Sequence, residues 1–181
     1  MATIEYQLGR PADNLLAVAV YCPFQKPAVL LTEPYSEEKG VFPTIYWLSC
    51  PYLVKEIARL EARGYVKSYS LLVKEDRDFR ERLRTAHKKY AEKRMALLSG
   101  EKVEKLKAGS PAIYRVLKDS GVGGINNLEG IKCLHVHVAD YLVNKENPIG
   151  EKVWDLLDWP EDCHICDGDR VREWQECLLE Q

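Results

Sequence analysis

The chain has 181 residues, of which 46% are hydrophobic and 30% charged, so it can bury a core and is not compositionally disordered. Its net charge of -2 excludes a surface that is basic throughout. The longest apolar run, Leu15–Cys22, has 8 residues, whereas a transmembrane helix needs roughly 20. The N-terminal sequence carries Glu5 and Asp13 and lacks the basic-then-apolar pattern of a secretion signal. We therefore expect a soluble, cytoplasmic protein without a membrane partner.

The N-terminal third predicts a small sheet followed by a helix. Branched apolar residues indicate neighbouring strands over 14–22 and 28–32, and an aromatic, β-branched stretch indicates another over 43–49. Pro51 is typical of the first residue of a helix, with Ser49 or Cys50 near its cap, and a glycine at position 64 ends the apolar stripe that follows.

The middle of the chain becomes basic after a further predicted strand over 65–73. From 74 to 107, twelve Lys and Arg face seven Asp and Glu, a net charge of about +5. Apolar residues at helical spacing predict one long amphipathic helix here, with Asp76 or Asp78 as its start, and a short helix over 111–118. The basic helix is a candidate surface for RNA or an acidic partner, although its interleaved acidic residues favour a solvated helix face.

The C-terminal part predicts two more helices. The stretch 131–143 fits both a helix and a strand, and its length favours a helix. A last short helix is expected over 151–157, and ten Asp and Glu against three Lys and Arg give 151–181 a charge of about -7. We therefore predict an α+β fold: one domain over 1–150, with a small, mostly antiparallel sheet packed against several helices, and a partly helical acidic tail over 151–181.

Cysteine and histidine residues gather in two clusters of the C-terminal part. Six cysteines without a secretion signal favour buried thiols, metal ligands or catalytic groups over a disulfide framework. On a helix, Cys133 and His137 lie one above the other, a spacing that lets two ligands share a metal. His135 would then point about 200° away. On a strand, all three side chains would converge.

The second cluster lies in the acidic tail. Cys163 and Cys166 form a Cys-x-x-Cys pair, the usual half of a structural zinc site. No second such pair exists, so the pattern is incomplete, and other residues complete a zinc site only if the tail folds back on the domain. The candidates for this role are Cys133, His137, His164 and Cys177. A redox dithiol and incidental surface thiols are the alternatives.

Short motifs follow one another in order along the chain. They are Leu8-Gly-Arg10, Val20-Tyr-Cys-Pro23, Phe42-Pro-Thr-Ile-Tyr-Trp-Leu-Ser-Cys-Pro51, Leu60-Glu61, Ala86-His87 with Tyr90 and Arg94, Gly121-Val-Gly-Gly124, Ile131-Lys-Cys-Leu-His-Val-His137 and Asn147-Pro-Ile-Gly150. In this order the chain resembles an uncharacterised bacterial family, the domain-of-unknown-function family numbered 501, over roughly residues 8–150. The resemblance implies no particular reaction. It draws attention to the thiol and imidazole groups inside the motifs: Cys22, Cys50, His87, Cys133, His135 and His137.

These groups suggest one site. Cys22 ends a predicted strand, Cys50 lies between a strand and a helix, and Cys133 and His137 share a helix face, so the four side chains can meet in an α+β layer. Three thiolates and one imidazole satisfy tetrahedral zinc and can also hold an iron–sulfur cluster. Cys50, at a helix N-terminus, is in addition expected to have a lowered pKa.

We therefore predict a metal site, with zinc as the metal and a binding or regulatory role for the protein. Its expected ligands are Cys22, Cys50, Cys133 and His137, with Cys163 and Cys166 as secondary candidates. With only three protein ligands, an open position would support metal-assisted hydrolysis, with His87 or His135 as general base. The alternative is a metal-free thiol hydrolase or transferase with Cys50 or Cys133 as nucleophile. The partner stays open, including a second copy of the chain.

Overall fold

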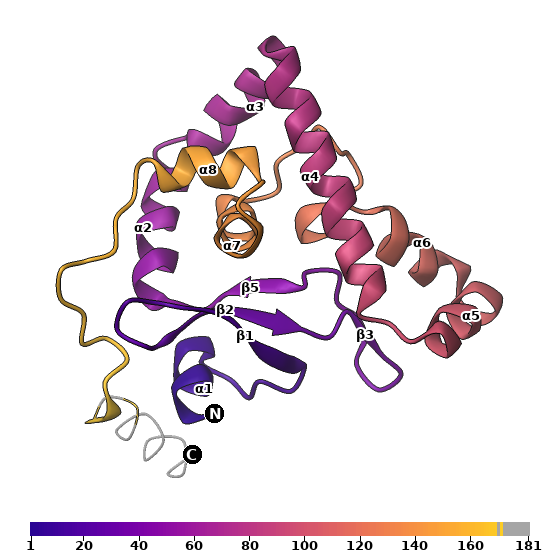
Figure 1. Ribbon diagram of the computed structural model, residues 1–181, viewed down its shortest axis with the longest axis horizontal. Helices are drawn as coiled ribbons and strands as arrows, with labels where there is room; N and C mark the ends of the chain where they lie inside the picture. The colour runs from indigo at the N-terminus through magenta and orange to yellow at the C-terminus, as the bar shows by residue number, and fades with distance from the viewer. Residues whose placement is uncertain (170, 172–181) are drawn as a thin grey trace.

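The structure, a computed structural model, describes residues 1–169 and 171 and confirms the α+β fold (Figure 1). Antiparallel strands form the main sheet in the order β1 (Leu15–Tyr21), β2 (Pro27–Thr32), β5 (Tyr46–Leu48), and β3 (Tyr35–Ser36) pairs with β4 (Gly40–Val41). The helices are α1 (Ala2–Leu8), α2 (Pro51–Ala62), α3 (Tyr65–Glu75), α4 (Arg77–Ala96), α5 (Gly100–Gly109), α6 (Pro111–Asp119), α7 (Leu134–Asn144) and α8 (Pro148–Trp154), with a 3-10 turn over Val122–Gly124. Within this part of the chain, no helix combines the length and the apolar character that crossing a membrane requires.

The main sheet lies between α1 on one face and α7 on the other (Figure 1). Paired residues of β2 and β5 show the two faces: Leu30 opposes Trp47, and Val29 opposes Leu48. Leu30 and Trp47 pack with Ile4 of α1, whereas Val29 and Leu48 belong to the main core. This is the alternation that a strand with a period of two residues produces when both faces are covered.

Helix α7 passes through the centre of the helical layer, between α2 and α4 (Figure 1). Leu134 and Val138 on it are fully buried. Helix α8 packs against it so closely that a Cβ added to Gly150 would lie 2.3 Å from the backbone oxygen of His137. Because α7 is enclosed in this way, the polar groups on it must find partners inside the protein.

Helix α4 carries a buried polar stripe, formed by His87, Tyr90 and Arg94, that binds backbone groups of the neighbouring segments. The Tyr90 hydroxyl accepts hydrogen bonds from the backbone N–H groups of Ile45 (2.8 Å) and Tyr46 (3.2 Å), at the start of β5. The Arg94 guanidinium, which has no exposed surface, donates to backbone oxygens in the last turn of α6, just after α6 and before β5. These acceptors are Pro43 (2.9 Å), Leu117 (2.6 Å), Gly121 (3.3 Å), Val116 (3.4 Å) and Ser120.

Most predicted elements are present in the structure. The three N-terminal strands, the helix that begins at Pro51 and the helix over 111–118 are confirmed as β1, β2, β5, α2 and α6. Cys50 is the N-cap of α2, and Asp76 caps α4 by accepting a hydrogen bond from the backbone N–H of Phe79 (2.9 Å). The ambiguous stretch 131–143 is helical from Leu134 onwards.

Other predictions about secondary structure are wrong. The stretch 65–73 is part of helix α3, because Tyr69 and Val73 are buried at a helical spacing of four residues rather than in alternation. The expected helix over 74–107 breaks before Ser99, which accepts a hydrogen bond from the backbone N–H of Lys102 and so starts α5. The sequence interpretation also missed α1, β3 and β4.

The C-terminal part differs from the prediction at its boundary. The last helix begins at Pro148 instead of residue 151, because Asn147 caps its first turn. Helix α8 therefore spans the predicted domain boundary at residue 150, and its Ile149 and Val153 are buried in the main core. The acidic tail continues beyond the described residues, and Cys177 lies outside them.

Replacement of Arg94 by Met should lower the free energy of unfolding by at least about 3 kcal/mol, since several buried carbonyls lose their donor and each unpaired group costs about 1–3 kcal/mol. Urea unfolding followed by circular dichroism measures this change. The matched control is Arg82→Met on the same helix, because Arg82 is half exposed and only pairs with Glu151. That control should change the stability by less than about 1 kcal/mol. Equal losses in both variants would contradict the anchoring role of Arg94.

Candidate metal site and adjoining pocket

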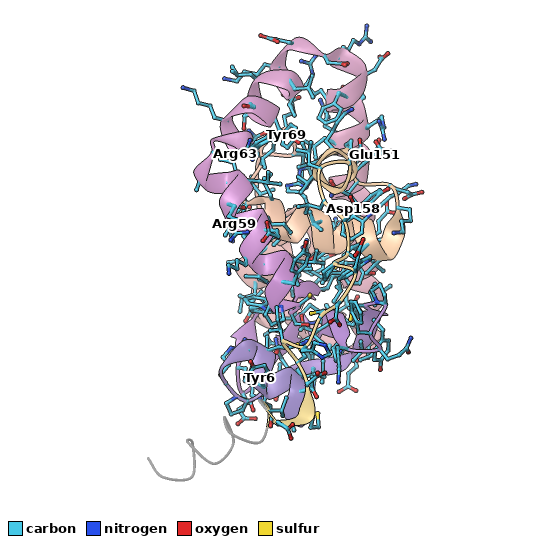
Figure 2. The ribbon with its side chains drawn as sticks, turned by 90° about the vertical axis from the view of Figure 1, so that its left-hand side faces the viewer. Tyr6, Arg59, Arg63, Tyr69, Glu151 and Asp158 are labelled. Atoms are coloured by element: carbon cyan, nitrogen blue, oxygen red, sulfur yellow. The ribbon has the colours of Figure 1, made fainter. Side chains whose placement is uncertain are left out.

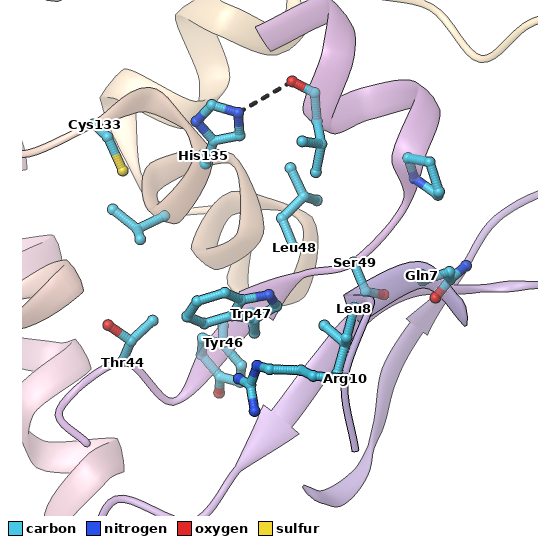
Figure 3. Close-up of a pocket in the computed structure, with 13 residues that line it drawn as sticks. Gln7, Leu8, Arg10, Thr44, Tyr46, Trp47, Leu48, Ser49, Cys133 and His135 are labelled. Carbon is cyan, nitrogen blue, oxygen red and sulfur yellow. Dashed lines mark hydrogen bonds between the residues drawn. The ribbon is translucent and has the colours of Figure 1, made fainter. Parts of the chain in front are cut away.

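A pocket of about 460 Å³ opens between α1, β5 and the facing ends of α2 and α7 (Figure 3). Its lining is largely apolar, with Trp47 in its middle and the side chains of Leu8 and Leu48 beside it. Arg10 extends along Trp47, with its guanidinium carbon 5.9 Å from the centre of the indole ring. A concave apolar space of this size with few polar groups is typical of a small-molecule site.

Two polar atoms in the pocket wall lack hydrogen-bond partners. They are Oε1 of Gln7 and Oγ of Ser49, and the Ser49 residue is only 2% exposed. Among the described residues, the only other buried side-chain nitrogen or oxygen in this condition is Nε2 of His137, which is not part of the pocket. Buried polar groups are nearly always paired, so these two enclosed oxygens in the pocket wall are exceptions.

Glu61, Cys133 and His135 form a cluster at the edge of this pocket. One ligand atom from each of them lies within 4.8 Å of the other two. Glu61 comes from the last turn of α2, Cys133 is the N-cap of α7, and His135 lies in the first turn of α7. Oε1 of Glu61 accepts a hydrogen bond from the backbone N–H of Leu134 (2.5 Å), so the carboxylate is fixed at the start of α7.

The ring of His135 faces an oxygen atom on each side. Its Nδ1 lies 3.2 Å from Oε1 of Glu61, and its Nε2 lies 3.1 Å from the carbonyl oxygen of Val54. A neutral imidazole has one N–H, so both contacts are favourable only when a second proton or another cation is present. Burial lowers the pKa of His135, but its contacts with Cys133, Val54 and Glu61 outweigh burial and raise the pKa above its ordinary value. The cluster therefore attracts positive charge.

A carboxylate, a thiol and an imidazole are all ordinary zinc ligands. Three protein ligands leave one position of a tetrahedral ion open, which is the arrangement of catalytic zinc sites. Cys133 and His135 both line the pocket, so an ion held between them would face it. Among the described residues, this is the only group of three or more such side chains whose ligand atoms lie within 4.8 Å of one another.

The structure does not bring the four predicted ligands together. Cys133 belongs to the cluster with Glu61, whereas His137 points into the interior beside α8. Its Nδ1 donates to the side-chain oxygen of Asn147 (3.2 Å), which also caps α8. Cys50 caps α2, and neither Cys50 nor Cys22 has its sulfur in the group of ligand atoms that lie within 4.8 Å of one another. The five cysteines of the described residues are free thiols.

His87, a candidate general base, is a buried residue of the stripe on α4. Its Nδ1 accepts a hydrogen bond from the backbone N–H of Val122 (2.9 Å), and its Nε2 therefore donates to the carbonyl of Gly130 (3.2 Å). Burial lowers its pKa to about 4. Both nitrogens are engaged, so in this structure neither can take a proton from a substrate.

Cys50 does not have the lowered pKa expected of a helix N-cap. Burial raises the pKa of its thiol to about 11, which outweighs the backbone hydrogen bonds from Leu53 and Tyr52. That part of the sequence interpretation is wrong, because the desolvation of a buried thiolate exceeds the stabilisation that a helix N-terminus provides.

Glu61 is the site residue that the sequence interpretation missed. It is part of the Leu60-Glu61 motif, but it lies more than seventy positions before Cys133 in the chain. Nothing in its local pattern distinguishes it from the other charged residues of α2. Its role follows only from the packing of the end of α2 against the start of α7.

Six of the eleven basic residues of α4 and α5 form ion pairs. The pairs between distant segments are Arg82–Glu151 (2.7 Å), Arg84–Glu129 (3.1 Å), Lys89–Glu146 (2.8 Å) and Lys102–Glu33 (2.8 Å). These pairs neutralise part of the net charge that the sequence shows for 74–107. Binding of RNA or an acidic partner by this surface stays a prediction.

The fold and the cluster define an α+β protein with a Glu/Cys/His group at the edge of an apolar pocket. The chain belongs to the family described as Protein of unknown function (DUF501), whose model matches residues 18–155. This match confirms the resemblance seen in the sequence, and it includes Glu61, Cys133 and His135 but ends before Cys163. No curated protein and no solved structure matches the chain.

The two buried histidines of the core should make the protein less stable in acid. Burial lowers the pKa of His87 to about 4 and that of His137 to about 3, whereas an unfolded histidine titrates near 6.5. Between these values the unfolded chain binds up to two more protons than the native protein. The free energy of unfolding should therefore fall as the pH falls, by about 2–3 kcal/mol per pH unit near pH 5.

Urea unfolding at a series of pH values measures this slope. Asp140 acts in the opposite direction, because burial raises its pKa and its protonation favours the native state. The matched variant is His87→Asn, whose side-chain oxygen can still accept from Val122 but does not titrate. This variant should roughly halve the slope, and an unchanged slope would contradict the assignment to His87.

Proposed function

We propose that the protein binds a small, largely apolar molecule in the pocket and acts on it with a zinc ion held by Glu61, Cys133 and His135. The observation that carries this proposal is the convergence of three ligand atoms, within 4.8 Å of one another, at the edge of an apolar pocket. The bound molecule would place its apolar part against Trp47 and Leu48 and its reacting group beside the metal.

The pocket itself supports a molecule with a polar end. Ser49 Oγ and Gln7 Oε1 have no protein partner, and both are part of the lining. After a change of rotamer, a hydroxyl or amide group of the bound molecule, which carries the donor that Gln7 Oε1 needs, would satisfy them and fix its orientation. Arg10 lies on the same side as Leu8 and adds a positive charge that favours a substrate with an anionic group (Figure 3).

The reaction class that fits this arrangement is metal-assisted hydrolysis. Bound zinc supplies a Lewis acid and lowers the pKa of a coordinated water to near 7. Glu61 has a second role as the acceptor for the N–H of Leu134, which holds its carboxylate in place. The Val54 carbonyl accepts from Nε2 of His135 and so leaves Nδ1 as the nitrogen for the metal.

Loss of one ligand should weaken zinc binding at this site by at least about 100-fold, because changes to mere supporting residues already cost about 10–100-fold. The variants are Glu61→Gln and His135→Ala, and the measurement is a zinc titration of tag-free protein after chelation. The matched control is Glu56→Gln, because Glu56 also lies on α2 and pairs only with Arg59 at the surface. The proposal fails if Glu61→Gln binds zinc as the control does.

Use of the pocket is tested with an aromatic hydroxamate, whose head group chelates zinc and whose ring fits an apolar cavity. It should quench Trp47 fluorescence in zinc-loaded protein and bind at least about tenfold more weakly to Glu61→Gln. Because the chain has four tryptophans, Trp47→Phe identifies the responding ring. Equal binding with and without zinc would contradict a metal that faces the pocket.

A second candidate function uses the same residues without metal. Cys133 is the N-cap of α7, and a hydrogen bond between its thiol and His135 contributes to the raised pKa of the imidazole. This pair is suited to nucleophilic chemistry by Cys133. Rapid iodoacetamide labelling of Cys133 that zinc does not slow would favour this function. Protection of Cys133 by zinc, reversed by a chelator, would favour the metal site.

A further inference from the structure

Four cysteines from three separate segments lie near the turn that joins β1 to β2. Cys22 begins the turn after β1, and Cys50 is the N-cap of α2. Cys163 and Cys166 lie in the segment after α8, which runs down past α2 and reaches α1 near Tyr6 (Figure 2). Cys22, Cys50 and Cys166 are each at least 93% buried.

Hydrogen bonds link these segments around the cysteines. The backbone N–H of Cys22 donates to the carbonyl of Lys26 (2.8 Å), and that of Cys50 donates to the carbonyl of Ala28 (3.3 Å). Both acceptors therefore lie within three residues at the start of β2. Cys50 thus lies next to the turn that Cys22 begins.

The segment after α8 also contacts the residues around the β1–β2 turn. Nε2 of Gln7 donates both to the carbonyl of Pro27 (2.9 Å) and to Sγ of Cys166 (3.2 Å). Asp167, the next residue, lies 3.7 Å from the ammonium group of Lys26. Residues 26–28 therefore contact all three segments that carry the cysteines.

The thiols also interact electrostatically. Burial is the main cause of the raised pKa of Cys50, and the nearby Cys22 and Cys166 raise it further. Burial likewise raises the pKa of Cys166, with added contributions from Cys163 and Cys22. The pKa values of Cys50 and Cys166 thus depend on the other two thiols, and a divalent cation among the four would stabilise them strongly as thiolates.

We propose that Cys22, Cys50, Cys163 and Cys166 bind a second, structural zinc ion that fastens the segment after α8 to the sheet. This set combines the Cys-x-x-Cys half-site with two thiols from the domain, and four thiolates close the tetrahedral coordination of zinc. His164, between the two tail cysteines, is not part of it, because its exposed ring binds Asp162 and Asp167.

Zinc binding draws these sulfur atoms closer together. In a tetrahedral site with Zn–S distances of about 2.3 Å, neighbouring sulfur atoms lie about 3.8 Å apart. These four thiols are not among the groups whose ligand atoms already lie within 4.8 Å in the described residues. The segment between Leu156 and Cys166 is in neither helix nor strand, so it can adjust without breaking a regular element.

The test is the zinc content of the full chain, purified without chelator. With both sites filled, the wild-type protein holds about two zinc ions per chain. Cys166→Ser and Cys163→Ser should each remove one of them, whereas Glu61→Gln should remove only the other. Both tail cysteines lie outside helices α1–α8, so circular dichroism should show that these variants stay folded. The proposed pocket site and this site therefore fail independently.

Cobalt substitution identifies the ligands. Thiolate-to-cobalt charge-transfer absorption grows with the number of coordinating thiolates, which is four here and one at the pocket. Cys166→Ser should therefore lose most of this absorption, and Cys133→Ser only a small part. The matched control is Gln7→Ala, which removes the hydrogen bond to Cys166 but no thiol and should keep the zinc.

Three results would overturn the proposal. The first is an unchanged zinc content in both tail variants. The second is iron with sulfide in place of zinc, which would assign the thiols to a cluster. The third is a disulfide between any two of the four cysteines, detected by mass spectrometry after alkylation without reduction.

Discussion

The arrangement of this protein depends on the buried polar stripe of α4, which supplies hydrogen bonds to backbone groups that water cannot reach. Loops in a protein interior carry N–H and C=O groups that cost free energy when they are unpaired. Here Tyr90 accepts hydrogen bonds from the start of β5, and Arg94 donates to carbonyls at the end of α6 and before β5. His87 forms hydrogen bonds with the loop that leads to α7. One helix thereby fixes three segments that are far from it in the sequence.

The candidate site follows from this constraint. His87 holds Val122 and Gly130 at the two ends of one loop, and it packs so closely that a Cβ on Gly121 would lie 2.3 Å from its Nδ1. Cys133 comes three residues after Gly130, so the start of α7 is fixed from the side of α4. On the opposite side, Glu61 accepts the N–H of Leu134. The thiol, the imidazole and the carboxylate meet because both neighbours of α7 determine where the helix begins.

The position at which α7 begins explains what the sequence could and could not predict. Local sequence patterns identified β1, β2, β5, α2, α6 and the helical character of 131–143, since each depends on local burial patterns. The ligand set depends on the residue at which α7 begins. Cys133 has an extended backbone as N-cap, so the helical spacing that would place it above His137 does not apply, and it lies with His135 instead. The partner Glu61 is supplied by tertiary packing, which no local pattern encodes.

The pocket and the four cysteines are neighbours in space, because both use the junction between α1, β2 and the start of α2. Gln7 is part of the pocket lining, and its side-chain nitrogen donates to the carbonyl of Pro27 and to Sγ of Cys166. Ser49 and Pro51, on either side of Cys50, also line the pocket. The position of the tail therefore affects the polar end of the pocket. The Glu/Cys/His cluster lies at the other end of the pocket. A molecule bound in the pocket would contact a wall positioned by α7 and a wall positioned by the four cysteines. The shape of the pocket therefore depends on both.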